Sequence, residues 1–161
     1  MKKIILIFLG YFTLINAFTQ EASTKPSTSE LTEVYKFIKD FKANYAVLTS
    51  STSSKYINFP LKIENGSFNL ETASSWATLS DDLKKYIQSL CNKIPENLEL
   101  DKSYEVTDYK LKMNYDASKL SYRILVEYDD EDWTCEELWI KKSNNKFLVF
   151  EYCFYSLMDL F

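Results

Sequence analysis

The chain has 161 residues, with 19 basic and 23 acidic side chains, a net charge of −4 at pH 7 and no histidine. The absence of imidazole excludes Ser-His-Asp and Cys-His catalysis and most zinc sites. Arg123 is the only arginine of this acidic chain, so we expect neither nucleic acid nor an anionic membrane surface as a partner.

The N-terminal residues have the pattern of a signal peptide. Two lysines precede an uncharged apolar run over 4–15, which is shorter than the about 20 residues that a transmembrane helix needs. Ala17 is the expected last residue of the signal, with Ala22 as the alternative. We therefore expect export to a periplasm or the medium, and no membrane span in the mature protein. The expected organisation is a signal peptide over 1–17, a polar leader over 18–29 and a single α+β domain over 30–161.

Two helices are predicted in the first half of the mature chain. The first begins near Ser27, which is placed to form a capping box with Glu30. Apolar residues then recur three or four positions apart, as on one buried helix face, at Leu31, Val34, Ile38, Phe41 and Tyr45. The second helical region starts at Thr72, has its clear helical pattern from Ser80 to about Asn92, and is ended by Pro95. Its apolar positions are Leu83, Ile87, Leu90 and Ile94.

A short hairpin is predicted between the two helices. Asn65-Gly66 separates two short apolar stretches, and this dipeptide favours a tight hairpin turn because both positions accept a positive φ. With Ser67 the same residues form a glycosylation sequon, which matters only in a eukaryotic secretory route. We favour the turn.

The second half of the chain alternates apolar and polar residues with a period of two. The predicted strands are Tyr104–Tyr115, Tyr122–Tyr128, Thr134–Lys142 and Lys146–Tyr155. Short turns between them predict a curved, antiparallel four-stranded meander. A sheet that is polar on one side needs the two helices on its other side, so the predicted class is α+β.

This order of elements resembles the nuclear-transport-factor-2-like fold, a cystatin-like α+β fold. The segments Tyr56–Leu61 and Lys146–Phe150 are also similar to uncharacterised secreted bacterial domains of that fold. The resemblance spans about residues 30–155 and implies a curved sheet and helices around a pocket. The family includes isomerases, dehydratases, binding modules and scaffolds, so the fold does not imply the function. No catalytic residue matches position by position, and none is predicted.

The register of the last two strands decides whether Cys135 and Cys153 meet. A two-residue turn at Asn144-Asn145 places Cys135 opposite Phe154, whereas a three-residue turn from Ser143 places it opposite Cys153. The second register pairs apolar with apolar side chains. We therefore predict a Cys135–Cys153 disulfide, with two free buried thiols as the alternative. Cys91, on the second helix, is expected to stay a free buried thiol.

The same register places Glu137 opposite Glu151, on the sheet face that also carries Trp139. Paired carboxylates raise the pKa of one partner and tryptophan offers a stacking surface, so these three residues are the candidate ligand site. The alternative is a solvated face. The acidic run Asp129–Asp132 lacks the glycine and distal glutamate of a calcium loop, and we interpret it as a solvated turn. No metal and no cofactor are predicted.

The favoured function is that of a secreted, non-enzymatic domain that binds a small molecule or another protein. It rests on the missing catalytic residue types and on the acidic, aromatic-rich composition, with 12 tyrosines and 11 phenylalanines. One alternative is a pocket enzyme that performs acid–base chemistry with carboxylate and tyrosine alone. The other is an inhibitor or immunity-type protein that blocks a partner enzyme.

Overall fold

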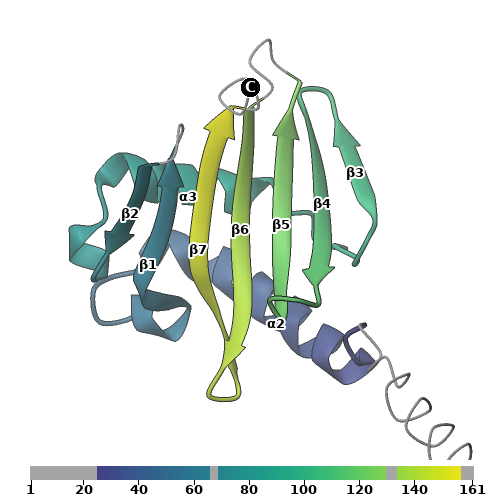
Figure 1. Cartoon of the computed structure of the whole chain (residues 1–161), viewed down its shortest axis with the longest axis horizontal. Helices are drawn as coiled ribbons and strands as arrows, with labels where there is room; N and C mark the ends of the chain where they lie inside the picture. The colour runs from purple at the N-terminus through teal and green to yellow at the C-terminus, as the bar shows by residue number, and fades with distance from the viewer. Residues whose placement is uncertain (1–24, 66–68, 130–133, 157–161) are drawn as a thin grey trace, which may run out of the picture.

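The computed structural model describes residues 25–65, 69–129 and 134–156. Figure 1 shows two helices packed behind one face of a sheet. The helices are α2 (Thr28–Asn44) and α3 (Asp81–Lys93), and the 3₁₀ turns are η1 (Tyr45–Val47), η2 (Ser53–Lys55) and η3 (Trp76–Thr78). The strands are β1 (Ile57–Asn65), β2 (Asn69–Ala73), β3 (Ser103–Val106), β4 (Tyr109–Asp116), β5 (Ser121–Tyr128), β6 (Thr134–Ser143) and β7 (Lys146–Ser156). Within these residues, no helix has the length and apolar character needed to cross a membrane.

The sheet is larger than the predicted four-stranded meander, although the α+β class is confirmed. It has seven strands in the order β2-β1-β7-β6-β5-β4-β3. The β1–β2 hairpin joins it through a parallel pairing of β1 with β7, while the other neighbours are antiparallel. The strand predicted from Tyr104 is divided at Thr107 and Asp108 into β3 and β4, which pair with each other.

Both helices begin at the predicted serines. The Ser27 hydroxyl accepts a hydrogen bond from the Glu30 amide, and the Ser80 hydroxyl accepts one from the Leu83 amide, each at 3.2 Å. These bonds satisfy amides that lack a partner within the first helical turn. The Glu30 carboxylate accepts from the Tyr122 hydroxyl at 2.9 Å, so it ties α2 to β5.

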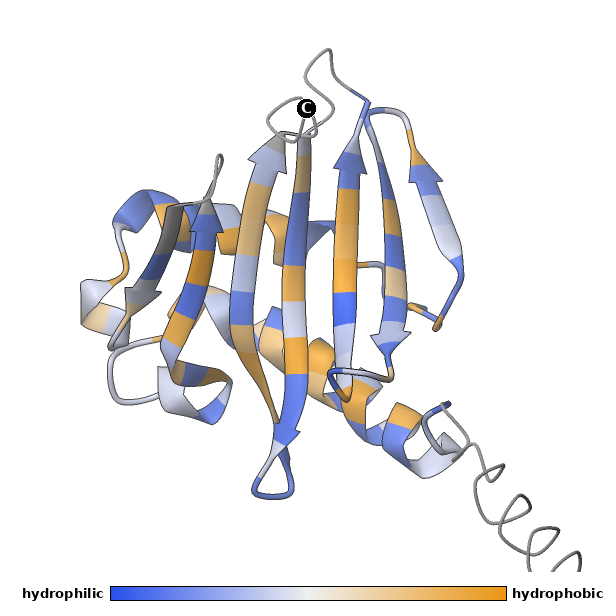
Figure 2. Cartoon of the chain, viewed as in Figure 1, coloured by the Kyte–Doolittle hydropathy of each residue, from blue (hydrophilic) through white to orange (hydrophobic). Residues whose placement is uncertain are grey.

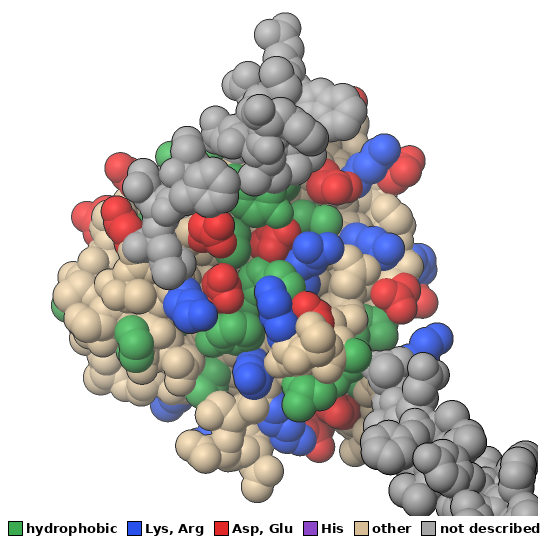
Figure 3. Space-filling view, viewed as in Figure 1, with side chains coloured by type: hydrophobic (Ala, Val, Ile, Leu, Met, Phe, Trp, Pro, Cys, Tyr) green, Lys and Arg blue, Asp and Glu red, His purple; other side chains and the backbone are tan. Residues whose placement is uncertain are grey.

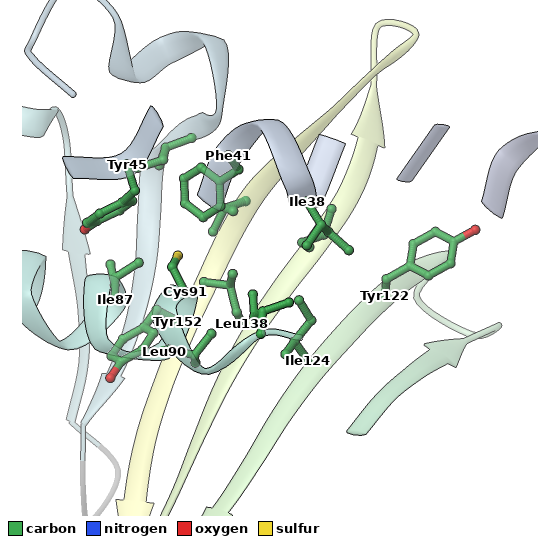
Figure 4. Close-up of a cluster of buried hydrophobic side chains, with 14 of the residues drawn as sticks. Ile38, Phe41, Tyr45, Ile87, Leu90, Cys91, Tyr122, Ile124, Leu138 and Tyr152 are labelled. Atoms are coloured by element: carbon green, nitrogen blue, oxygen red, sulfur yellow. The ribbon is translucent and has the colours of Figure 1, made fainter. Parts of the chain in front are cut away.

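The core lies between the two helices and the concave face of the sheet. Figure 2 shows apolar residues alternating with polar ones along the strands, and Figure 4 shows helix and strand side chains converging on one cluster. The apolar stripes predicted for the helices face this cluster, since Val34, Ile38, Phe41, Ile87 and Leu90 are buried. Burial of these stripes is what holds the helices on the sheet.

The β6–β7 hairpin shows that the predicted Cys135–Cys153 disulfide is wrong. Its turn is the two-residue one, with positive φ values of 49° and 61° at Asn144 and Asn145. A register shift then leaves Phe150 as an extra residue in β7, since Trp139 pairs with Glu151 but Ile140 pairs with Val149.

As a result, Cys135 pairs with Tyr155 and Cys153 pairs with Glu137. The two thiols share a sheet face but are two positions out of register, and all three cysteines, Cys91 included, are free and buried. The sequence prediction assumed an unbroken ladder. The two-residue turn together with the bulge also pairs apolar with apolar residues, Leu138 with Tyr152 and Ile140 with Val149, without bringing the cysteines opposite each other.

Other predicted features lie outside the described residues. These are the signal peptide and its cleavage site, Gly66 at the tip of the first hairpin, and most of the acidic run, Asp130–Asp132. The hairpin itself is confirmed, since Leu61 to Asn65 pair with Asn69 to Ala73.

Candidate functional site

A groove of about 270 Å³ lies between α3 and the β2-β1-β7 side of the sheet. The first turn of α3 forms one wall, and the concave sides of β1, β2 and β7 form the other. Figure 1 shows α3 running behind these three strands. The lining residues are Ile63, Glu71, Ser80, Asp82, Leu83, Tyr86, Tyr152 and Phe154. This volume is close to the lower end of the range for small-molecule sites, about 300–1,000 Å³.

Tyr152 is a deeply buried wall of this groove, with only 1% of its surface exposed. Its hydroxyl oxygen makes no hydrogen bond to any described residue. Figure 4 shows the ring beside the aliphatic core and the hydroxyl pointing away from the centre of the cluster. Burial raises the pKa of this phenol, so it stays protonated and can donate a hydrogen bond. An unsatisfied buried hydroxyl costs about 1–3 kcal/mol of stability, which makes it unusual in a purely structural role.

Glu136 of β6 adds a second incompletely paired group beside Tyr152. Its side chain lies on the concave face at 3% exposure, opposite Phe154. Its Oε2 atom accepts no hydrogen bond, although the Lys93 ammonium lies 3.9 Å away. Burial raises the pKa of this carboxyl, and the charge of Lys93 and a hydrogen bond from Tyr128 oppose the shift only in part.

The mouth of the groove combines aromatic rings with carboxylates. Tyr86 of α3 is 49% exposed and stacks on Phe154, with ring centroids 5.9 Å apart and planes inclined by 6°. Glu71 of β2 is exposed and forms no ion pair with a described residue. Asp82 pairs at 3.2 Å with Lys85, one turn further along the helix. None of the described residues that line the groove is basic.

On the opposite, outer face of the sheet, Glu137 is a buried carboxylate with several donors. Only 4% of the residue is exposed. It accepts hydrogen bonds from Arg123 at 3.2 Å, from the Trp139 indole at 2.8 Å and from the Tyr155 hydroxyl. Figure 3 shows this face with charged side chains of both signs among apolar ones. The surroundings of Glu137 are therefore those of a residue with a structural role, because side-chain donors surround it and Arg123 balances its charge.

The predicted site residues lie on this outer face, but not in the predicted arrangement. Glu137 pairs with Cys153, and Glu151 pairs with Trp139, so the two carboxylates are not directly opposed. Trp139 is 6% exposed, with the Lys119 ammonium 4.0 Å from the centre of its ring. Its ring is therefore covered and offers no open stacking surface. Binding of a ligand at these three residues stays a prediction.

One set of potential metal ligands is present within the described part of the chain. It comprises Glu64, Glu151 and Cys153, whose ligand atoms lie within 4.8 Å of one another. The Cys153 thiol lies 3.9 Å from each carboxylate. Burial, and then the surrounding carboxylates, raise the pKa of this thiol. A metal would need the thiolate, so the folded protein opposes the deprotonation that binding requires.

Sequence reasoning missed the residues of the concave groove. Glu136 lies two residues before Leu138 and four before Ile140 on β6, so the period of two along a strand places all three on the same inward-facing side. That signal was available. No such signal places Glu71 at the groove, because the parallel β1–β7 pairing that brings β2 beside α3 has no local sequence signature.

Comparisons with known proteins bear on the fold alone. No protein-family model matches the chain, and no curated protein matches it. The solved structure "Rd1NTF2_04 with long sheet" is 10% identical, with 74% of this chain and 96% of that chain covered and a TM-score of 0.35. A DUF4783 family protein from Bacteroides ovatus is 8% identical, with 73% and 92% covered and a TM-score of 0.32. A protein of unknown function with a cystatin-like fold from Nostoc punctiforme is 9% identical, with 82% and 94% covered and a TM-score of 0.35. Two of these proteins are described as NTF2-like and cystatin-like, the fold that the order of elements in this chain resembles.

Proposed function

We propose that this protein is a non-enzymatic binding domain that takes a small organic ligand into the groove between α3 and the β2-β1-β7 side of the sheet. The observation that carries the proposal is the Tyr152 hydroxyl, which is buried in the wall of that groove without a hydrogen-bond partner among the described residues. A ligand that supplies the missing partner would gain affinity from it.

The groove supports binding better than catalysis. Glu136 is not among its lining residues, so a bound molecule meets the Tyr152 phenol before it meets the carboxyl. An enzyme needs its acid or base within hydrogen-bond reach of the reacting atom. The aromatic wall of Tyr86 and Phe154 instead provides apolar contact area, which is the main component of small-molecule sites.

Replacing Tyr152 by phenylalanine tests the proposal. We expect Tyr152→Phe to keep or raise the free energy of unfolding, by up to about 1 kcal/mol, because it removes an unsatisfied buried hydroxyl. The same substitution should weaken the binding of small aromatic fragments detected by ligand-observed NMR. Urea unfolding measures the first effect and fragment titration the second.

Tyr122→Phe is the matched control, since Tyr122 is equally buried but donates its hydroxyl hydrogen to Glu30. Loss of that bond to a charged acceptor should lower the free energy of unfolding by about 1.5–3 kcal/mol. Fragment binding in the groove should be unaffected. If no fragment binds the wild-type protein, or if Tyr152→Phe destabilises as much as Tyr122→Phe, the Tyr152 hydroxyl is not free for a ligand and the proposal fails.

A pocket enzyme is the second candidate, and Glu136 is the observation in its favour. A buried carboxyl with a raised pKa keeps its proton to a higher pH than an exposed one, which favours a role as a general acid. Such an enzyme would need a local movement that opens the groove toward Glu136.

The raised pKa of Glu136 predicts a specific pH dependence of stability. The folded carboxyl keeps its proton to a higher pH than the unfolded one, whose pKa is near 4.5. Between these two pKa values the folded state binds more protons than the unfolded state, so the free energy of unfolding decreases as the pH rises through this range. Above the folded pKa this decrease ends. We expect Glu136→Gln to be more stable than wild type at pH 7, with the difference shrinking toward pH 4.5. Urea unfolding at both pH values measures this, and a pH-independent difference would remove the basis for acid–base chemistry.

We also propose export, with loss of the N-terminal signal. The proposal rests on the two lysines and the uncharged run over 4–15. We expect the exported protein to lack about 17 to 21 residues, which N-terminal sequencing of the secreted form would measure. Recovery of an exported chain that still begins at Met1 would contradict the proposal.

A further inference from the structure

We infer that the ligand of this groove is positively charged, and we propose a primary amine attached to an aromatic or aliphatic group. This inference rests on the proposed function, because it names the chemical class of the ligand that the groove accepts. Three features of the groove support it: the sign of the charges around its mouth, the stacked aromatic pair in its wall and the unpartnered Tyr152 hydroxyl at its inner end.

The charges at the mouth are negative. Glu71 and Asp82 line the groove from opposite walls, one on β2 and the other in the first turn of α3. Among the described residues, Glu71 has no ion-pair partner, and the groove is lined by no lysine or arginine. Both side chains of the Asp82–Lys85 ion pair are about three-quarters exposed, so the Asp82 carboxylate is also open to solvent. A cation that enters this groove therefore meets carboxylates on two sides, of which Glu71 has no ion-pair partner among the described residues and Asp82 pairs with Lys85.

An anion would be disfavoured at the same place, even though a helix begins there. The amino end of a helix attracts anions through its free amides and its dipole. In α3 the Ser80 hydroxyl already accepts from the Leu83 amide, and Asp81 and Asp82 already place two negative charges in the first turn. The positive end of the helix is thus occupied by the protein's own acidic groups.

The aromatic pair offers a second mode of cation recognition. Tyr86 and Phe154 stack face to face, and Tyr86 is half exposed at the mouth. A ring face is negatively polarised and attracts ammonium groups that lie within about 6 Å of its centroid. The protein uses this contact elsewhere, since the Lys93 ammonium lies 4.9 Å from the centroid of the Tyr128 ring. Tyr86 has its solvent-facing side available for the same contact with a ligand.

The inner end of the groove adds a hydrogen-bonding group without a partner. The Tyr152 hydroxyl oxygen, which has no hydrogen-bond partner among the described residues, can accept a hydrogen bond from an N–H donor. A primary ammonium group is a donor only and carries no acceptor, so it is complementary to this oxygen and to the carboxylates at the mouth. A carboxylate or phosphate ligand could accept from the Tyr152 hydroxyl, but it would meet the Glu71 and Asp82 carboxylates with a charge of the same sign.

The experiment compares three probes of the same size and different charge on the mature protein. Benzylamine is cationic, benzyl alcohol is neutral and benzoate is anionic at pH 7. We expect benzylamine to bind about tenfold more tightly than benzyl alcohol, from its contacts with the ring and the two carboxylates, and benzoate to bind more weakly than both. Affinities are measured by ligand-observed NMR titration. The advantage of benzylamine should decrease at high salt because the carboxylates are exposed.

Variants at the mouth identify the groups responsible. Glu71→Gln removes one exposed negative charge and should weaken benzylamine binding by about two- to fivefold without changing benzyl alcohol binding. Tyr86→Leu keeps an apolar side chain but removes the ring, and should reduce the preference for the amine. Glu105→Gln is the matched control, because Glu105 is an exposed glutamate on β3 at the other edge of the sheet. It should leave all three affinities unchanged.

The outcomes separate this inference from the proposed function. If benzylamine and benzyl alcohol bind equally well, and both bind more weakly to Tyr152→Phe, the groove binds ligands but the inferred charge class is wrong. If benzoate binds best, the inference is also wrong. If none of the probes binds, the proposed function is overturned together with the inference.

Discussion

Glu137→Ala should lower the free energy of unfolding by about 3 kcal/mol, although Glu137 lies on the sheet face away from the helices. The substitution leaves the Arg123 guanidinium, the Trp139 indole and the Tyr155 hydroxyl without the acceptor they share. A hydrogen bond to a charged group contributes about 1.5–3 kcal/mol. The three contributions are not additive, and about a third of the Arg123 side chain remains open to water, which compensates part of the loss.

Urea unfolding at pH 7 measures this effect, which corresponds to a drop of the melting temperature by about 10 °C. Glu127→Ala is the matched control, because Glu127 is an exposed glutamate on the neighbouring strand β5. Exposed substitutions of this kind change stability by about 0.5 kcal/mol or less. If the free energy of unfolding decreases equally little in both variants, the Glu137 network does not stabilise the fold. The outer face is then the solvated face that the sequence analysis gave as the alternative.

The helices were predictable because their signals are local. Ser27 and Ser80 cap the first turns, and the apolar residues recur at the spacing of a helix face. Each of these patterns lies within about four residues along the chain. The structure therefore agrees with the predicted start of both helices, and with the burial of Val34, Ile38 and Phe41 on the first.

The sheet was predictable only where neighbouring strands are joined by short turns. The pairing of β4 with β5, and of β5 with β6, follows from such turns. The pairing of β1 with β7 joins residues about 90 positions apart, as Ile57 with Val149, and no local pattern encodes it. That pairing places the β1–β2 hairpin beside α3 and so creates the groove.

The error at Cys135 and Cys153 has a similar origin. Pairing apolar with apolar residues was the correct criterion, since Leu138 faces Tyr152 and Ile140 faces Val149. The same criterion is met either by a three-residue turn or by a two-residue turn with a bulge. A bulge depends on how the whole strand bends over the core, which a comparison of two strands alone does not reveal.

Trp139→Ala should destabilise the protein by about 3–5 kcal/mol, and this effect on folding should exceed any effect on ligand binding in the groove. The sequence suggested Trp139 as a ligand-stacking residue on a polar sheet face. In the structure only 6% of it is exposed, beneath the Lys119 ammonium and beside Arg123. Truncation to alanine leaves a cavity and removes a hydrogen-bond donor from Glu137.

Trp139→Phe separates these two losses, because it keeps most of the ring but removes the indole N–H. We expect it to cost about 1.5–3 kcal/mol, the range for a hydrogen bond to a charged group, and the alanine variant to cost more. Combining Trp139→Phe with Glu137→Ala should cost less than the sum of the single changes, since both remove the same bond. Additive losses in urea unfolding would show that Trp139 stabilises the sheet by packing alone. A Trp139→Ala protein that melts like wild type but loses benzylamine binding would restore Trp139 as a ligand residue and move the site to the outer face.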